Sequence, residues 1–300
     1  MSALRIGSRG SQLALWQANH IADALRSLGH SVSIQIIKTT GDRLQDAAFR
    51  AANPEAEDGK GIFIKEIEEA LAAGSIDLAV HSLKDLPTEL APQFILGAIP
   101  KRADARDVLV SVGGKTLADL PEKARVGTTS PRRQTQLLAL RDDLQFVAMR
   151  GNVDTRLRKL EEGRADALVL AAAGLERLGL TQWISYRFSV SEVCPAPGQG
   201  ALAIECRAND AVTQALLAPL DDAATRYAVT AERAALHALG GGCSVPIGIF
   251  CETSDGGYIL RGARSLDNAL MRKLVEVDAN VSAEEAGAQM AAAMQEVRFS

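Results

Sequence analysis

The chain contains an internal repeat, and this repeat constrains the fold more than any other feature. The pattern of Arg5-Ile6-Gly7-Ser8 recurs 120 residues later as Arg125-Val126-Gly127-Thr128. In each place a short apolar strand is followed by small residues and then by the apolar spacing of a helix. A second pair of segments repeats the spacing of one glycine, one aspartate and one valine: Gly74, Asp77 and Val80, then Gly163, Asp166 and Val169.

The repeat predicts two similar α/β domains. Strands that alternate with helices form mainly parallel sheets, which bind ligands at the carboxyl ends of their strands, near helix N-termini. Segments 94–99 and 201–206 are the strands expected to leave and re-enter the first domain. The segments 100–103 and 195–198 contain proline and are the expected hinges. Two domains joined by two crossings would face each other across a cleft.

The last part of the chain follows a different pattern. A predicted helix ends at the glycines before Cys243, and Ser282-Ala283-Glu284-Glu285 is a capping box that opens a final helix. Three strand patterns lie between them: 247–252, 258–264 and 274–281. We therefore expect a small α+β domain. The predicted bounds are 1–100 with 200–219 for the first domain, 101–199 for the second and 220–300 for the third.

Composition narrows the class of protein. Of the residues, 47% are hydrophobic and 23% charged, as in ordinary soluble globular proteins. The first ten residues lack an apolar signal segment and the longest apolar run, 167–173, is too short to cross a bilayer. A cytoplasmic protein without membrane contact is therefore expected. The net charge of −4 and the 4% aromatic content argue against nucleic-acid binding.

One of the four cysteines has unusual neighbours. The cysteines show no C-x-x-C spacing, so neither a metal site nor a disulfide framework is expected, and the thiols should be free in a reducing compartment. Cys243 follows Gly240-Gly241-Gly242 and precedes Pro246. One glycine would cap the helix, so the other two suggest that a bulky group approaches the backbone beside the sulfur. The alternative is a helix cap followed by a buried cysteine.

The loop after the first strand suits an anion. Residues 7–11 join a strand to a helix start, where free N–H groups and the helix dipole favour negative charge, and Arg9 adds a full positive charge. Ser11 could equally serve only as the N-cap. Further along, the polar stretch 41–60 predicts a mobile loop, long enough to act as a lid.

Arginines gather at the strand-to-helix junctions of the second predicted domain. Guanidinium groups bind carboxylates through two parallel hydrogen bonds, so this cluster fits a ligand with several carboxylates or phosphates. Arginines on helix surfaces, such as Arg158 and Arg164, are instead interpreted as a solvated basic face. Arg132, Arg133 and Arg150 lie at predicted strand-to-helix junctions, and the loops expected to line the cleft also carry Arg156, with Arg177 after the next strand.

A carboxylate stands at the corresponding strand end of the first domain. Lys84 and Asp85 follow the apolar strand there, where the second copy has Ala172 and Ala173. A carboxylate among arginines stays ionised, and can stabilise a cationic intermediate or exchange protons with it. The alternative is an ordinary surface turn, since Asp-Leu-Pro is common in turns.

Six motifs, in order, make the chain resemble the porphobilinogen deaminase (hydroxymethylbilane synthase) family over essentially its whole length. They lie at Ser8 to Gln17, Gly59 to Phe63, His81 to Pro87, Arg132 to Gln134, Arg150 to Arg156 and Gly241 to Gly248. Three positions depart from the family's common residues. Gln12 stands where proline is common, Pro131 where leucine is common, and Ser244 where glutamine is common. None of these departures removes a charge or the thiol.

The resemblance implies a transferase that joins four porphobilinogen molecules head to tail, with loss of ammonia, into hydroxymethylbilane for tetrapyrrole and haem biosynthesis. It implies a dipyrromethane cofactor held by the thioether of Cys243, and Asp85 as the catalytic carboxylate. The other implied cofactor-binding residues are Lys84, Ser130, Arg132, Arg133, Arg156 and Gly174. The implied substrate-binding residues are Arg9, Ser11, Lys60, Arg150 and Arg177.

Together these features predict an α/β fold with two similar hinged domains of the periplasmic-binding-protein type, mainly parallel sheets, and a small C-terminal α+β domain. A monomer that binds porphobilinogen is expected. A non-catalytic anion-binding protein of the solute-receptor type is the main alternative, although such receptors usually carry an export signal. A cysteine-nucleophile hydrolase would need a base near the thiol, and the helix should carry the local histidine, His237, away from the turn.

Overall fold

The computed structural model describes residues 2–43, 64–240, 245–266 and 269–295. The chain divides into two compact units. Unit 1 comprises Met1–Lys101 and Ala201–Ala223, and unit 2 comprises Arg102–Gly200 and Ala224–Ser300. The chain passes between the units three times, after Lys101, after Gly200 and after Ala223. The first two places lie in or beside the segments expected to be hinges, whereas the bounds of three separate domains stay a prediction. Two predicted site residues, Lys60 and Cys243, lie outside the described residues.

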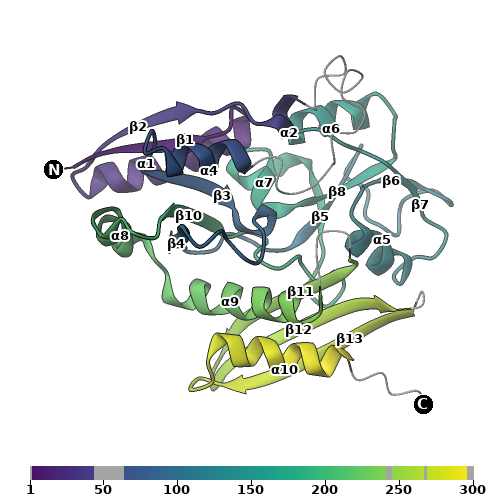
Figure 1. Ribbon diagram of the computed structural model, residues 1–300. Coiled ribbons are helices and arrows are strands. Elements are labelled where there is room, and N and C mark those ends of the chain that lie inside the picture. The colour runs from purple at the N-terminus through teal and green to yellow at the C-terminus, as the bar shows by residue number, and fades with distance from the viewer. Residues whose placement is uncertain (1, 44–63, 241–244, 267–268, 296–300) are drawn as a thin grey trace. The chain divides into compact units, whose positions relative to one another are not determined.

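Unit 1 is built on a five-stranded sheet of order β2-β1-β3-β10-β4. Strands β2, β1 and β3 are parallel, and β10 is antiparallel to both of its neighbours, so four of the five strands run in one direction. The strands are β1 (Ala3–Ser8), β2 (Ser31–Ile36), β3 (Leu78–Ser82), β4 (Phe94–Ala98) and β10 (Leu202–Arg207). The helices of the unit are α1 (Gln12–Ser27), α2 (Thr40–Arg43), α4 (Lys65–Ala72) and α8 (Ala211–Leu217) (Figure 1).

Unit 2 contains a second sheet with the same arrangement, of order β7-β6-β8-β5-β9. Here β5 is the antiparallel strand in the fourth place. The strands are β5 (Asp107–Ser111), β6 (Arg125–Gly127), β7 (Gln145–Val147), β8 (Ala167–Ala171) and β9 (Ile184–Arg187). The accompanying helices are α5 (Pro131–Leu138), α6 (Val153–Glu161) and α7 (Ala172–Arg177).

The strand registers relate the two sheets residue by residue. Ile6 pairs with Leu78 in the first sheet as Val126 pairs with Ala167 in the second, so β3 corresponds to β8 with an offset of 89 residues. Even the irregularities correspond, because the register shifts between Ile204 and Glu205 and also between Leu109 and Val110. The predicted repeat is therefore a repeat of structure.

An identical clamp closes one end of both sheets. The Arg5 backbone N–H and guanidinium donate to the Asp77 carboxylate, and the Asp77 N–H donates to the Arg5 carbonyl. Arg125 and Asp166 make the same set of bonds in unit 2. The arginine and aspartate of the repeat thus serve the fold, as hydrogen bonds between neighbouring strands.

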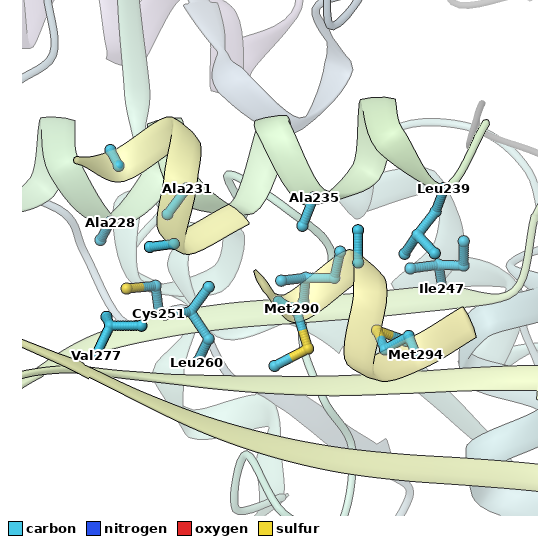
Figure 2. Close-up of a cluster of buried hydrophobic side chains, with 14 residues drawn as sticks. Ala228, Ala231, Ala235, Leu239, Ile247, Cys251, Leu260, Val277, Met290 and Met294 are labelled. Atoms are coloured by element: carbon cyan, nitrogen blue, oxygen red, sulfur yellow. The ribbon is translucent and has the colours of Figure 1, made fainter. Parts of the chain in front are cut away.

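The third sheet is antiparallel, with order β11-β12-β13, and α9 (Ala223–Ala238) and α10 (Ala283–Gln295) lie against it (Figure 1). Figure 2 shows small side chains of α9, such as Ala231 and Ala235, facing the same core as Met290 and Met294 of α10. Gly287 allows the two helices to approach closely, because a Cβ there would lie 2.5 Å from the Ala231 carbonyl oxygen. The strands are β11 (Ile247–Ser254), β12 (Gly257–Leu266) and β13 (Ala269–Asp278).

The three sheets confirm the predicted fold class, while several details differ from prediction. Strand β13 begins and ends earlier than the predicted segment 274–281. The helix α2 occupies the start of the predicted loop 41–60, whose remainder lies outside the described residues. Strands β5, β7 and β9 were not among those predicted, because two of them are only three or four residues long and β5 opens with a buried aspartate.

Candidate active site

The carboxylate predicted to be catalytic follows the central strand of unit 1. Leu83–Asp85 forms a single 3-10 turn directly after β3, and Asp85 is exposed. The Leu83 N–H donates to the Ala201 carbonyl, and Gln17 Nε2 donates to Ser82 Oγ at 2.8 Å. The turn that carries Lys84 and Asp85 is thus attached to its sheet and to α1. This is the carboxyl end of a parallel strand, where ligands of such sheets bind.

The equivalent turn in unit 2 carries no charge at these positions. The Ala172 N–H donates to the Arg106 carbonyl as the Leu83 N–H donates to the Ala201 carbonyl. By this register Lys84 corresponds to Ala173, and Asp85 corresponds to Gly174. The comparison made from the sequence, with Ala172 and Ala173, is therefore wrong by one residue, but the asymmetry it noted remains.

Arg9 is held by a carboxylate of its own unit. Its guanidinium donates to Asp42 Oδ1 at 2.6 and 3.0 Å. The other carboxylate oxygen accepts from the Thr39 N–H and hydroxyl. Burial alone would raise the pKa of Asp42, but the bonds from Arg9 and Thr39 hold it below its ordinary value. Ser11 is the N-cap of α1, accepting from the Ala14 N–H, so its capping role is present.

Two of the predicted ligand-binding arginines surround a buried carboxylate in unit 2. Arg132 donates to Asp107 Oδ2 at 2.6 Å, and Arg133 donates to Oδ1 at 2.7 Å. Gln199 Nε2 adds a bond of 2.9 Å to Oδ1. Burial would raise the pKa of Asp107, but the two guanidinium groups outweigh it and hold the pKa far below its ordinary value. Asp107 therefore compensates much of the charge that these arginines bring to the site.

The other predicted residues of unit 2 stand nearer the surface. Ser130 is the N-cap of α5 but makes no capping bond with its side chain, and Arg150 is exposed. Arg156 Nε donates to the Gly151 carbonyl at 2.7 Å. Arg177 donates to the Gly200 carbonyl at 2.7 Å, and burial lowers the pKa of Arg177 to about 10. At Gly174 the space is open, because a Cβ would meet only Val153 Cγ2, at 4.0 Å.

The segments on both sides of Cys243 are anchored within unit 2. On α9, Glu232 is fully buried and accepts a two-bond ion pair from Arg102, at 2.6 and 3.1 Å. Its oxygens also accept the N–H groups of Gly198 and Cys251, each within 2.8 Å. One carboxylate thus connects the helix before Cys243, the strand after it, and the two segments predicted to be hinges. Charge-assisted bonds of this kind are strong when they are buried and fully paired.

The cysteines that the structure describes are unsuited to thiolate chemistry. Cys194, Cys206 and Cys251 are buried free thiols. Burial raises the pKa of Cys194 to about 12 and that of Cys206 to about 11, and also raises the pKa of Cys251. Since the thiolate is the nucleophile, these three sulfurs are unreactive at neutral pH.

Most of the predicted residues closely follow a strand, with Arg9, Ser11, Lys84 and Asp85 in unit 1 and Ser130, Arg132, Arg133, Arg150 and Gly174 in unit 2. Arg156 instead lies inside α6, and Arg177 is the last residue of α7. Three carboxylates were missed from the sequence: Asp42 and Asp107, which pair with predicted arginines, and Glu232, which pairs with Arg102. A charged residue opening an apolar run, as in Asp107-Val108-Leu109-Val110, was the available signal for Asp107. Among the described residues, no three His, Cys, Asp or Glu side chains are arranged to hold a metal ion. No helix in the described ranges has the length and apolarity to span a membrane.

The solved structures that this chain resembles are distant. One is a nutrient binding protein from Burkholderia cenocepacia bound to methionine, 14% identical, with a TM-score of 0.44, covering 71% of this chain and 90% of that chain. Another is a periplasmic substrate-binding protein of an ABC transporter from Coxiella burnetii, 17% identical, with a TM-score of 0.43, covering 74% of this chain and 94% of that chain.

Similarity in sequence is far closer. The family model described as porphobilinogen deaminase, dipyromethane cofactor binding domain, matches residues 4–215, and that of the porphobilinogen deaminase C-terminal domain matches 226–296. The porphobilinogen deaminase of Roseiflexus sp. is 53% identical over 261 residues, which cover 86% of this chain and 84% of the relative. That of Xanthomonas euvesicatoria is 47% identical over 287 residues, covering 95% and 92%. The chain therefore belongs to the porphobilinogen deaminase family.

Proposed function

We propose that the protein joins four porphobilinogen molecules head to tail, releasing ammonia at each addition, and liberates hydroxymethylbilane. The growing chain is held on a dipyrromethane that is attached through the sulfur of Cys243. The observation that carries this proposal is the match of residues 4–215 to the cofactor-binding domain of the family, at about half identity to its members. The exposed Asp85 at the end of β3 supplies the carboxylate that this chemistry needs.

The residues of unit 2 fit a dipyrromethane. Each pyrrole carries an acetate and a propionate, so the group needs cations, hydrogen-bond donors and an open approach to the backbone. Ser130 has a hydroxyl that is not used for capping, Gly174 has open space beside it, and Arg156 adds charge. Arg132 and Arg133 contribute less net charge than their number suggests, because Asp107 lies between them. When bound, the group supplies a carbon nucleophile that starts the chain.

Asp85 acts on the arriving substrate. When the C–N bond of porphobilinogen breaks, ammonia leaves with the electron pair, and the ring that remains carries a positive charge. The Asp85 carboxylate stabilises this charge and accepts hydrogen bonds from the pyrrole N–H groups. After the new C–C bond forms, the attacking carbon loses its proton, and a carboxylate in this place can accept it. Lys84 on the same turn balances the carboxylates of the rings.

Arginines bind the substrate side chains in this proposal. Arg9, Arg150 and Arg177, with Ser11 and Lys60, contact the acetate and propionate groups. Because Asp42 already occupies the Arg9 guanidinium, a substrate carboxylate must share or displace that partner. The expected monomeric state and cytoplasmic location are part of the same proposal, as is the absence of nucleic-acid and membrane partners. Size-exclusion chromatography with light scattering tests the monomer.

The decisive experiment is the mass of the intact protein. The purified chain should exceed its sequence mass by two porphobilinogen units less their ammonia. Cys243→Ser should fold but lack this addition, because oxygen is a much poorer nucleophile than sulfur. Cys206→Ala is the matched control, since it removes a buried thiol and should retain the full addition.

Two results would contradict the proposal. A Cys243→Ser protein with the full added mass would show that attachment is elsewhere. If the wild-type protein carries the addition but neither consumes porphobilinogen nor releases ammonia, it is a binding protein rather than an enzyme.

A further inference from the structure

Unit 1 has three further ionisable residues of interest, which lie on β3, β10 and α4. His81 Nε2 and Glu205 Oε2 are 2.9 Å apart, and both residues are buried. Among the described residues Glu205 Oε1 has no hydrogen-bond partner. Helix α4 packs against β3 and β10. Burial and the charge of Glu205 raise the pKa of Glu68 on this helix, whereas the charge of His81 lowers it.

The second copy of the fold fills the same three places with apolar residues. The offset of 89 residues that relates β3 to β8 makes Leu170 the residue equivalent to His81. The same offset relates α4 to α6 and makes Leu157 equivalent to Glu68. Glu205 pairs with Ala79 as Val110 pairs with Leu168, and the register shifts beside both. Leu157, Leu170 and Val110 belong to one hydrophobic core.

The fold therefore does not require the ionisable trio. Buried ion pairs are commonly no more stabilising than apolar side chains of similar volume, and a buried carboxylate oxygen without a partner costs free energy. Unit 2 shows that this architecture accepts the apolar solution. The polar solution occurs in the copy that carries Lys84 and Asp85, and His81 is the fourth residue before Asp85 on the same strand and turn.

We infer that His81, paired with Glu205, is a positioning residue for the turn of Lys84 and Asp85, and that the turn responds to its protonation. An imidazolium attracts carboxylates on β10 and α4 and so holds the end of β3 against both elements. A neutral ring keeps one hydrogen bond and leaves Glu205 uncompensated. The catalytic consequence rests on the proposed function, whereas the coupling between His81 and the turn does not.

The coupling is tested by NMR on the wild-type protein, without substrate. The backbone amide shifts of Lys84 and Asp85 should change with pH along the same curve as the imidazole signals of His81, because imidazole titrates between about pH 5 and 8. In Glu205→Gln the curve should change, because the carboxylate that bonds the ring is gone. In His81→Leu the change should vanish. If the amide shifts of Lys84 and Asp85 do not follow the imidazole signals of His81 in the wild type, the inference is wrong.

The catalytic consequence is tested by giving unit 1 the apolar residues that unit 2 has at the three equivalent positions. The triple variant Glu68→Leu, His81→Leu, Glu205→Val should fold as unit 2 does. Its kcat, measured on cofactor-loaded protein, should fall by about three- to thirtyfold with little change in KM, and the pH profile should lose one ionisation. A triple variant with the wild-type kcat and pH profile would overturn the inference.

The single variant Glu205→Gln keeps the shape of the side chain and answers the same question if the triple variant does not fold. Its pH profile should shift with the NMR curve, and an unshifted profile would contradict the inference. A wild-type protein that does not consume porphobilinogen would refute the proposed function alone, because the NMR result stands without it.

Discussion

The two five-stranded sheets share their strand order, register and irregularity, yet they bury opposite kinds of residues at matching places. Unit 1 buries His81 and Glu205 where unit 2 has Leu170 and Val110. Unit 2 buries Asp107 where unit 1 has Leu202, and it surrounds that carboxylate with arginines. The shared Arg–Asp clamp belongs to the fold, whereas the buried charges distinguish the copies. Each half of the repeat has therefore been specialised around a different polar group.

The largest effect on stability is expected from the polar group of unit 2. Asp107→Asn leaves Arg132 and Arg133 buried without their counter-charge, which should destabilise the protein by about 3–5 kcal/mol. Urea unfolding at pH 7 measures the loss. The exposed Asp119→Asn is the control in the same unit, and an equal unfolding midpoint for the two variants would contradict the role given to Asp107.

The same variant makes a prediction about pH. Although burial would raise it, the pKa of Asp107 is held below its ordinary value by the two arginines. The stability that Asp107 contributes is therefore complete above the ordinary carboxylate range, about pH 4, and is lost as the pH falls through the lower pKa of the folded state. The difference between wild type and Asp107→Asn should be constant from pH 7 to 5 and shrink below about 4.

A smaller effect, on rate rather than stability, is expected at the charged turn of unit 1. Asp85→Asn keeps the shape of the exposed side chain but not its charge, so the rate of ammonia release in a single turnover should fall at least about a hundredfold, or roughly 2.7 kcal/mol. Asp85→Glu should retain more activity. The measurement uses cofactor-loaded protein, with Asp23→Asn as the surface control. A near-normal rate of ammonia release by Asp85→Asn would mean that Asp85 is an ordinary turn residue without a catalytic role.

The smallest effect tests what the two copies share. Asp77→Asn and Asp166→Asn each remove the charge from the same clamp, which lies partly in solvent. Each should lower the urea midpoint by roughly a quarter of the Asp107→Asn effect or less. Asp77→Asn should cost slightly more, because Arg207 also approaches Asp77, at 3.6 Å. Clearly unequal losses beyond this would mean that the clamps are not equivalent.

The fold was largely predictable from the sequence because its main signals are local. The spacing of Gly74, Asp77 and Val80 reports a helix end and the next strand, and its repetition reports the second copy. Ser282 caps α10 as the capping box predicts, accepting the Glu285 N–H. Short strands such as β7 and β9 lack enough residues to show a period, so they were not predicted.

The partners of the site residues could not be predicted, because they depend on register between distant segments. Asp42 lies 33 residues from Arg9, and Glu205 lies 124 residues from His81. Charge type alone does not show whether an arginine such as Arg132 meets a ligand or an internal carboxylate. The predicted roles of Lys60 and Cys243 stay predictions, because both residues lie outside the described part of the chain.

The position of β10, the antiparallel strand of the first sheet, affects how the chain folds while it is being synthesised. Strand β10 lies between β3 and β4, but its residues follow the whole second sheet in the chain. A ribosome that adds about 5–20 residues per second must therefore make all of β5 to β9 before the first sheet can close. The half that is synthesised first is completed last. Until then β3 and β4 are left as open edges, which are the parts of a sheet that pair most readily with other chains.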